Sequence, residues 1–441
     1  MGTFDVIVIG TGVAGGTVAA ECAIAGLHVA VTDRLPYGGT CAQRGCDPKK
    51  VLLAAAEAVG RSQALAGHGL DGEMHIVWPR LVARKREFVG GVPEGTERRL
   101  RDAGATLFHG EARFVAPDTV EVDGERLTAG AIVVATGATP RPLGIPGEEW
   151  LTHADAFMDL DELPSRIVFV GGGYISFEFA ALAHRAGAEV TIVHRSSRVL
   201  KGFDRDLATQ LVDRYRTLGI DVLLETPTLA VRRDGEALVV ETAAGRLVAD
   251  LVVHGAGRVP DLAALDLATG GVEADARGIV VDPSLRSVSN PRVFAAGDAA
   301  AAGLALTPPA SRQARVVVRG VLGQAATYDP TATASVAFGD PPLAAVGMGV
   351  EEAEGRDDIE VLVNDMSAWF TQRRLGHTHA GAKIVRERAT GKILGAHVLG
   401  ANADEVINVL ALAVRHGLTT DEVADAVWAY PTASSDIGYL V

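Results

Sequence analysis

Two cysteines five positions apart are the residues of this chain best suited to chemistry. Cys41 and Cys46 precede an Ala/Leu/Val-rich stretch with helical spacing. On an ideal α-helix, residues five apart are separated by about 7.5 Å along the axis and point to different sides, whereas a disulfide needs Cα atoms about 4.4–6.8 Å apart. Joining the pair therefore requires a distorted first helical turn, which Gly45 permits.

The charges around the pair favour a thiolate. Arg44, Lys49 and Lys50 are cationic, and a helix N-terminus acts in the same direction. Two alternatives are unpaired structural cysteines and half of a metal site, but a zinc site would need further Cys or well-placed His ligands. The third cysteine, Cys22, is expected in the core. The pattern favours redox chemistry and no metal.

An internal repeat indicates how the chain could hold a redox cofactor. Segments 5–34 and 166–195 align without a gap at an offset of 161 residues. Each has an apolar run, a Gly-x-Gly turn, a helical stretch and a second β-branched run. This order predicts two βαβ units.

The first copy has the spacing of a dinucleotide site. Gly10, Gly12 and Gly15 would permit the tight turn, the approach of a pyrophosphate and close helix packing, while Asp33 could bind a ribose diol. An ordinary strand–turn–helix is the alternative. The strand context, the spaced acid and the repeat favour the dinucleotide site.

The second copy keeps Gly171 and Gly173 but lacks the acid. His194 stands at the position of Asp33, and Arg195 follows it. A carboxylate there would repel the extra phosphate of NADPH, whereas Arg195, together with the downstream cations Arg198 and Lys201, could pair with it. A solvated basic loop is the alternative. NADPH is therefore favoured over NADH.

Length and charge limit the other functions. A chain of 441 residues is expected to form about two to four domains. Its net charge of -14 leaves no obvious basic stripe, which argues against nucleic acid as a partner. The N-terminus lacks the pattern of a secretion signal, and no apolar run reaches about 18 residues. We expect a soluble, cytoplasmic protein without a membrane partner.

Over nearly its whole length the chain resembles the class I pyridine nucleotide-disulfide oxidoreductases, which include glutathione reductase, dihydrolipoamide dehydrogenase and mercuric reductase. The resemblance rests on the motif Gly-Gly-Thr-Cys41-x4-Cys46-x-Pro-Lys49, which is highly specific. Further matching motifs are Ala135-Thr-Gly137, Gly257-Arg258-Val-Pro260, Ala296-Gly-Asp298, Leu306-Thr-Pro308 and Pro341-Pro342 through Val346-Gly347.

The resemblance implies an α/β fold with two Rossmann-like domains, for FAD and NAD(P), and a C-terminal α+β dimerisation domain. The expected boundaries are 1–148 for the first part of the FAD domain, 149–277 for the NADPH domain, 278–330 for the second FAD part, and 331–441 for the dimerisation domain. In the last, residues 383–398 suggest paired strands and 405–416 an amphipathic helix. A homodimer is implied.

The resemblance also assigns roles to residues. Electrons would pass from NADPH through FAD to a Cys41–Cys46 disulfide, with Cys46 next to the flavin and Cys41 as the interchange thiol. Lys49, paired with Glu178, would lie beside the flavin, and Tyr174 would cover the nicotinamide pocket. FAD would be bound by Gly10, Gly12, Gly15, Asp33, Thr40, Gly137, Asp298 and Thr307, and NADPH by Gly171, Gly173, Tyr174, Arg195 and Lys201.

The C-terminus departs from this family. Its usual ending is His-Pro-Thr-x-x-Glu, in which the histidine of the partner subunit serves the interchange thiol as acid and base. Here Tyr430 replaces the histidine and Ser435 the glutamate, with Asp436 one residue further on. A phenol with a reference pKa near 10 is a poor base at neutral pH. Tyr430 is either catalytic or merely an interface aromatic.

Three functions remain open from the sequence. The leading one is an NADPH-dependent reductase of a disulfide or another electron acceptor. The second is a reductase of quinones, metal ions or oxidants that need no histidine, although the C-terminus lacks the cysteine pair that mercuric reductases carry. A thiol-dependent carboxylating enzyme is a minor variant. The third is a flavin-bound sensor with weak turnover.

Overall fold

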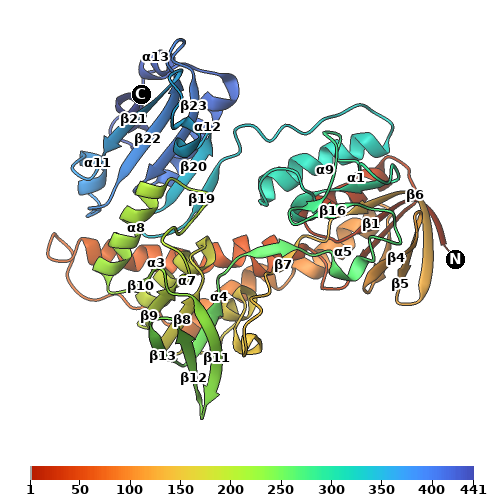
Figure 1. Cartoon of the computed structure of the whole chain (residues 1–441), viewed down its shortest axis with the longest axis horizontal. Helices are drawn as coiled ribbons and strands as arrows, with labels where there is room; N and C mark the ends of the chain where they lie inside the picture. The colour runs from red at the N-terminus through yellow and green to blue at the C-terminus, as the bar shows by residue number, and fades with distance from the viewer. Residues whose placement is uncertain (1) are drawn as a thin grey trace. The chain divides into compact units, whose positions relative to one another are not determined.

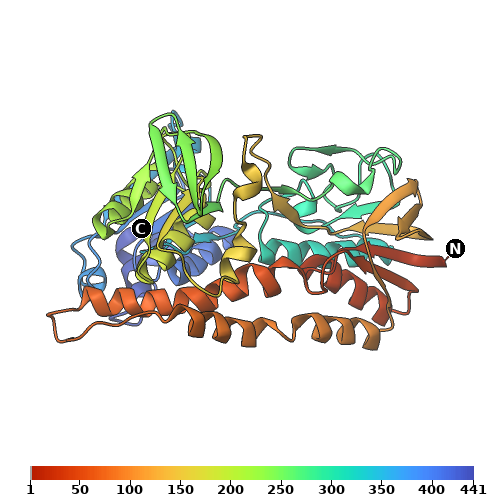
Figure 2. The ribbon, with the colours of Figure 1, turned by 90° about the horizontal axis from the view of Figure 1, so that it is seen from below.

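The computed structural model describes residues 2–441, which form two compact units (Figure 1). Unit 1 comprises Met1–Lys50, Ala83–Arg141 and Arg258–Pro330, and unit 2 comprises Val51–Val82, Pro142–Gly257 and Thr331–Val441. Two helices, α3 (Cys46–Ala64) and α4 (Trp78–Val89), contain residues of both units. They run alongside each other (Figure 2), and their apolar faces share one core cluster.

Unit 1 is built on a seven-stranded sheet in the order β3-β2-β1-β6-β5-β4, with β18 also paired to β6. The neighbours β3, β2, β1, β6 and β18 are parallel, and β5 and β4 are antiparallel. The strands are β1 (Gly2–Ile9), β2 (Val29–Asp33), β3 (Thr106–His109), β4 (Ala112–Ala116), β5 (Thr119–Val122), β6 (Glu125–Val134) and β18 (Val293–Ala295). The other elements of unit 1 are α1 (Val13–Ile24), α2 (Gly39–Arg44), α5 (Val92–Asp102), α9 (Thr307–Val321), η2 (Ala263–Leu265), η3 (Gly297–Ala299) and the strand pairs β7 (Ala138–Pro140) with β15 (Arg258–Pro260) and β16 (Ala274–Asp275) with β17 (Gly278–Ile279).

The first part of unit 2 repeats the βαβ arrangement. Its parallel sheet has the order β10-β9-β8-β14. The strands are β8 (Arg166–Val170), β9 (Glu189–Val193), β10 (Asp221–Leu223) and β14 (Leu251–His254), and the helices are η1 (Glu148–Trp150), α6 (Ala154–Met158), α7 (Tyr174–Arg185) and α8 (Arg205–Leu218). An antiparallel sheet follows, made of β11 (Thr228–Asp234), β12 (Ala237–Thr242) and β13 (Gly245–Ala249). Both predicted βαβ units, β1-α1-β2 and β8-α7-β9, are thus confirmed.

The C-terminal part of unit 2 is a five-stranded antiparallel sheet covered by α12 (Figure 1). Its strands are β19 (Ser335–Ala337), β20 (Leu343–Gly347), β21 (Ile359–Asp365), β22 (Gly381–Glu387) and β23 (Ile393–Leu399). Its helices are α10 (Val350–Ala353), α11 (Phe370–Arg373), α12 (Ala403–His416), α13 (Thr420–Ala424), η4 (Ala433–Asp436) and α14 (Ile437–Leu440). The predicted strand pair within 383–398 and the amphipathic helix are confirmed as β22, β23 and α12.

A buried lysine joins this sheet to the neighbouring βαβ unit. Lys383 of β22 is almost fully buried and donates to Asp204 at 3.0 Å and to Asp206 at 2.5 Å. Burial lowers the pKa of Lys383, but its hydrogen bonds to the two carboxylates raise it overall. Asp204 is itself buried and caps α8 by accepting from Leu207 N at 3.0 Å. Each buried charge therefore needs the other.

We expect Lys383→Met to lower the free energy of unfolding by about 3–5 kcal/mol, because it leaves the carboxylate of Asp204 buried without its cation. Urea denaturation followed by circular dichroism measures the change. Lys392→Met is the matched control, since Lys392 is exposed and its replacement should change stability by about 0.5 kcal/mol or less. An equal loss in both variants would contradict the interpretation.

Candidate active site

Gly45 interrupts the helix that carries the two cysteines. It separates α2 from α3, so that Cys41 lies in the first helix and Cys46 begins the second. A Cβ atom on Gly45 would lie only 2.8 Å from the carbonyl oxygen of Thr40 and 3.2 Å from Cα of Cys41. Only glycine fits such a close approach. The distortion expected from the spacing of the cysteines is therefore present.

The hydroxyl of Thr307 lies between the two sulfurs. Its Oγ1 donates to Sγ of Cys41 at 3.1 Å and lies 3.7 Å from Sγ of Cys46. Thr307 is the first residue of α9, more than 250 residues away in sequence, and the structure holds both cysteines as free thiols. Three residues from two distant segments of unit 1 thus form one cluster.

The two thiols of this cluster have opposite pKa shifts. The hydrogen bond from Cys41, assisted by Thr307 and the charge of Lys49, lowers the pKa of Cys46 to about 6, against the opposing effect of burial. The hydrogen bond with Cys46 raises the pKa of Cys41, and burial adds to this rise. At neutral pH the pair therefore holds one thiolate, on Cys46, and one proton, on Cys41.

The loop between β1 and α1 has the shape of a dinucleotide cradle. Gly10 has φ +103°, and a Cβ atom there would lie 2.2 Å from the carbonyl oxygen of Ala135. A Cβ atom on Gly15 would lie 1.9 Å from the carbonyl oxygen of Gly10. At Gly12 the nearest protein atom would be 3.7 Å away, on Gly39, so the backbone leaves room for a ligand. This geometry fits the turn, ligand approach and helix packing expected from the spacing, and the binding of a dinucleotide by these glycines stays a prediction.

Asp33 closes one side of this cradle at the end of β2. Its Oδ2 accepts from the amide and the hydroxyl of Thr11, at 2.8 and 2.6 Å, and its Oδ1 accepts from Leu35 N at 3.0 Å. The Thr11 hydroxyl in turn accepts from Gly38 N at 3.1 Å. Thr11 was missed by the sequence analysis, because its partner Asp33 is 22 residues away and nothing in the motif links them.

Two polar side chains beside the cradle fit a bound dinucleotide. Oγ1 of Thr136 is buried and, within residues 2–441, has no hydrogen-bond partner. Burial raises the pKa of Asp298 in η3, with Arg258 opposing the shift. Gly137 follows with φ +73° and open space around it, and Thr40 is exposed in α2. These donors and acceptors could bind the phosphates and the polyol chain of FAD.

The second glycine loop is also preformed, but it is closed differently. Gly171 has φ +116°, and a Cβ atom on it would lie 2.4 Å from Gly255. Gly173 precedes α7, whose first residue, Tyr174, is 44% exposed. Ser176, at the third position of the motif, is buried so close to Gly255 that a Cβ atom there would lie 1.9 Å from its hydroxyl. Ser176 therefore fits only because residue 255, which directly follows β14, is a glycine.

The cations that follow β9 have two different environments. Arg195 and Lys201 are exposed. Arg198 is half-buried, with its Nη2 at 2.8 Å from Oε1 of Glu351. His194 contacts the hydroxyl of Ser196 at 2.9 Å and the carbonyl oxygen of Arg198 at 3.0 Å, and burial lowers its pKa. Arg195 and Lys201 are thus the exposed cations of this loop, whereas Arg198 is paired with Glu351.

Comparison with known proteins decides the family. Residues 4–314 match the model of the pyridine nucleotide-disulphide oxidoreductases, and residues 333–440 match the dimerisation domain of the same family. The chain belongs to the pyridine nucleotide-disulphide oxidoreductase family.

Named relatives are spread over several activities. The chain is 32% identical to a glutathione reductase of Burkholderia cepacia, covering 98% of this chain and 97% of the relative, and 30% identical to a dihydrolipoyl dehydrogenase of Chlamydia pneumoniae, covering 98% and 95%. Among solved structures, the Cu(II) complex of the HOCl-induced flavoprotein disulfide reductase RclA from Escherichia coli has a TM-score of 0.88 at 28% identity, covering 100% of this chain and 99% of that one. The chain is accordingly an oxidoreductase and a flavoprotein with a glutathione reductase-like fold, and the family uses FAD and a pyridine nucleotide.

The carboxylate expected to pair with Lys49 lies in unit 2 of this oxidoreductase. Glu178 of α7 is fully buried, and its Oε1 accepts from Phe338 N at 2.9 Å. Lys49 lies in unit 1, where its charge lowers the pKa of Cys46. The pairing of Lys49 with Glu178 stays a prediction.

Three polar residues of the altered C-terminus, Tyr430, Ser435 and Asp436, differ in exposure and in hydrogen bonding. Tyr430 is 74% exposed. Ser435 donates to the carbonyl oxygen of Thr432 at 2.6 Å and helps to cap η4. Asp436 is buried and accepts from the hydroxyl of Thr371, and burial raises its pKa. Ser435 and Asp436 are engaged within the C-terminal part, so only Tyr430 is presented at the surface.

We expect Thr307→Val to raise the pKa of Cys46, because the variant lacks a hydroxyl that stabilises the thiolate. A higher pKa means less thiolate near pH 6, so iodoacetamide should label Cys46 of the reduced protein about three- to tenfold more slowly at that pH. Mass spectrometry across a pH series locates and quantifies the label. Thr307→Ser keeps the hydroxyl and should retain the wild-type midpoint near pH 6; a midpoint unchanged in the valine variant would exclude this role.

Proposed function

We propose that this chain is an FAD-dependent NADPH oxidoreductase that reduces a disulfide or another acceptor through Cys41 and Cys46. The observation that carries the proposal is the cluster of the two sulfurs around Thr307 with their opposite pKa shifts. A thiolate and a thiol held in contact are the reduced form of a redox disulfide. Unpaired structural cysteines or a metal site would not account for the Thr307 hydroxyl beside both sulfurs or for the opposite pKa shifts of the two thiols.

We propose the cofactor sites from the family motifs, and the geometry of the two glycine loops supports them. FAD would be held by Gly10, Gly12, Gly15, Asp33, Thr40, Gly137, Asp298 and Thr307, and NADPH by Gly171, Gly173, Tyr174, Arg195 and Lys201. Bound FAD would supply electron transfer between the nicotinamide and the sulfurs. The preference for NADPH rests on Arg195 and Lys201, which are exposed, and on His194, which stands where a carboxylate would bind NADH.

Proton transfer limits what the dithiol can reduce. To attack a disulfide, Cys41 must lose its proton and form a mixed disulfide while the other substrate sulfur leaves with an electron pair; Cys46 then displaces the second sulfur and closes the Cys41–Cys46 bond. The raised pKa of Cys41 makes the first loss unfavourable. The family histidine that would accept this proton is Tyr430 here, which is a poor base.

The second candidate function is reduction of quinones, metal ions or oxidants. It is favoured by Tyr430 and by the engagement of Ser435 and Asp436 in local hydrogen bonds. The structural similarity to an HOCl-induced disulfide reductase with bound Cu(II) agrees with this alternative. Acceptors of this kind take electrons without a proton being removed from Cys41 first. A sensor with weak turnover would need the cysteine cluster to be idle.

We further propose a homodimer. The C-terminal part is the family's dimerisation domain, and it exposes large apolar side chains. These are Val363, Phe370, Leu412, Val427, Tyr430 and Tyr439. An exposed set of this kind is typical of a surface that another chain covers.

Within residues 2–441 no helix has the length and apolarity required to cross a bilayer.

Anaerobic addition of NADPH to the purified FAD protein tests the cysteine pathway. We expect a long-wavelength absorbance band, because a Cys46 thiolate would lie next to oxidised flavin. Cys46→Ser should abolish the band. Cys41→Ser, which has no disulfide to reduce, should show the band before NADPH is added, because its Cys46 thiolate already lies beside oxidised flavin, and should lose it when NADPH reduces the flavin. A band that survives in Cys46→Ser, or is absent from the wild type, would overturn the proposed function.

Replacement of Tyr430 by histidine distinguishes the two candidate functions. If the native acceptor needs no base, Tyr430→His should raise kcat/KM for a small disulfide on the order of 10²-fold, because an imidazole can take the proton of Cys41. Rates with a quinone should stay within about twofold. Tyr430→Phe serves as the control for the loss of the hydroxyl. A wild type that already reduces a disulfide as fast as the histidine variant would instead make disulfides the native substrate.

A further inference from the structure

The loop between Arg198 and Asp204 is attached at both ends to the C-terminal part of unit 2. At its start, Nη2 of Arg198 lies 2.8 Å from Oε1 of Glu351, which belongs to α10. At its end, Asp204 accepts from the buried ammonium of Lys383 at 3.0 Å. Lys201, one of the two exposed cations proposed to bind the 2′-phosphate, lies between these two attachments.

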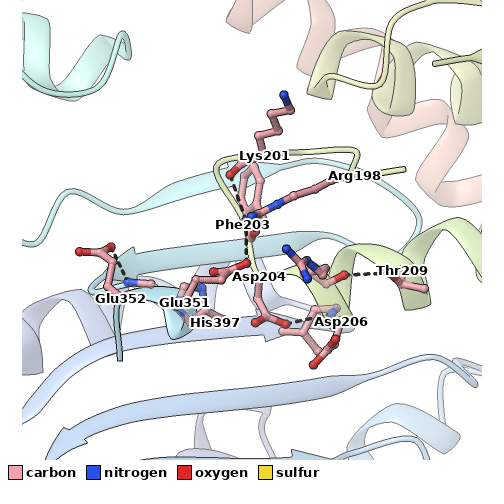
Figure 3. A network of polar contacts seen from close by, with 12 residues as sticks. Arg198, Lys201, Phe203, Asp204, Asp206, Thr209, Glu351, Glu352 and His397 are labelled. Atoms are coloured by element: carbon pink, nitrogen blue, oxygen red, sulfur yellow. Dashed lines mark hydrogen bonds and ion pairs between the residues drawn. The ribbon is translucent and has the colours of Figure 1, made fainter. Parts of the chain in front are cut away.

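Arg198 also organises the loop from within. Its Nη2 donates to the carbonyl oxygens of Lys201 at 3.4 Å and Phe203 at 3.3 Å. Figure 3 shows its guanidinium turned toward these carbonyls and Glu351, while the side chain of Lys201 points away from the network. The guanidinium is therefore used to hold the backbone, and the ammonium of Lys201 is presented outward.

We propose that Glu351 is a positioning residue for the 2′-phosphate site: by holding Arg198, it fixes the loop that presents Lys201. The inference rests on the proposed use of NADPH and deepens it. A charged pair between half-buried partners fixes a loop more firmly than backbone bonds at 3.3 and 3.4 Å do alone. The dimerisation domain thereby contributes to the choice of nucleotide without touching it.

The alternative is that Arg198 binds the 2′-phosphate directly and that Glu351 merely withdraws it. The two interpretations predict opposite signs for one variant. Glu351→Gln removes the ion pair and a negative charge with almost no change in shape. If Arg198 were a phosphate ligand, the variant would bind a 2′-phosphate more tightly, since the guanidinium would be released and a repulsive charge lost. If Arg198 holds the loop, binding weakens.

Glu352 provides the matched control on the same helix. Its Oε1 accepts from Gly349 N at 3.0 Å and helps to cap α10, away from Arg198. Glu352→Gln removes the same charge and keeps an oxygen acceptor for that hydrogen bond. Any difference between the two glutamine variants therefore reports the contact with Arg198, not the net charge.

The experiment is calorimetric titration of the FAD-loaded protein with adenosine 2′,5′-bisphosphate and, separately, with AMP. We expect Glu351→Gln to weaken bisphosphate binding about three- to tenfold and to leave AMP binding within about twofold. Glu352→Gln should match the wild type for both. Tighter bisphosphate binding in Glu351→Gln, or an unchanged ratio of the two Kd values, would overturn the inference.

The calorimetric result also shows which proposal has failed. If the wild type binds AMP as tightly as the bisphosphate, the proposed NADPH preference is wrong, and the positioning role is wrong with it. If the wild type prefers the bisphosphate and Glu351→Gln prefers it to the same degree, only the positioning role fails.

Limited trypsin digestion tests the loop itself. Cleavage after Lys201 should accelerate in Glu351→Gln, and an unchanged rate of cleavage counts against the positioning role. Should Glu351→Gln fold poorly, Glu351→Asp keeps the charge on a shorter side chain. It should bind the bisphosphate more weakly than the wild type while AMP binding is unchanged, and wild-type binding of both ligands would overturn the inference.

Discussion

The contact between two sulfurs five residues apart is the constraint on which the rest of the active site depends. A continuous helix would hold Cys41 and Cys46 on different sides. The break at Gly45 brings them together, and Thr307, at the start of a distant helix, places a hydroxyl in contact with both. The result is an asymmetric pair, with the negative charge on Cys46 and the proton on Cys41. The proposed reduction of a disulfide depends on this asymmetry.

The same asymmetry explains why the C-terminus matters for the substrate. A pair that keeps its proton on the outer sulfur can be reduced readily, but it exchanges with a disulfide only when that proton can leave. Tyr430 stands at the place of the family histidine, and a phenol is a poorer base than an imidazole. The proposed function therefore combines electron transfer into the cysteine pair with an exchange step that lacks the family histidine, and the named relatives have several different activities.

The C-terminal part is tied by ion pairs to the βαβ unit that precedes it. Its strand β22 supplies the buried Lys383, and its helix α10 supplies Glu351, both of which pair with the segment that follows β9. Buried and half-buried charges make such contacts specific, because each leaves an uncompensated charge when its partner is lost. The loop that carries Lys201 and the dimerisation domain are therefore linked by electrostatics within one compact unit.

The sequence by itself determined the features that depend on local geometry. The repeat predicted both βαβ units, because glycine turns and apolar runs act within about 30 residues. The spacing of Cys41 and Cys46 indicated that joining them requires a distorted first helical turn, which Gly45 permits. The tertiary structure alone decided the partners that come from far along the chain. Thr11 with Asp33, the place of Thr307 between the sulfurs, and the pairing of Arg198 with Glu351 are long-range contacts. Arg198 shows the reason most clearly. From the sequence, a cation in a basic loop predicts phosphate binding, but only the fold determines that Arg198 pairs with the carboxylate of Glu351.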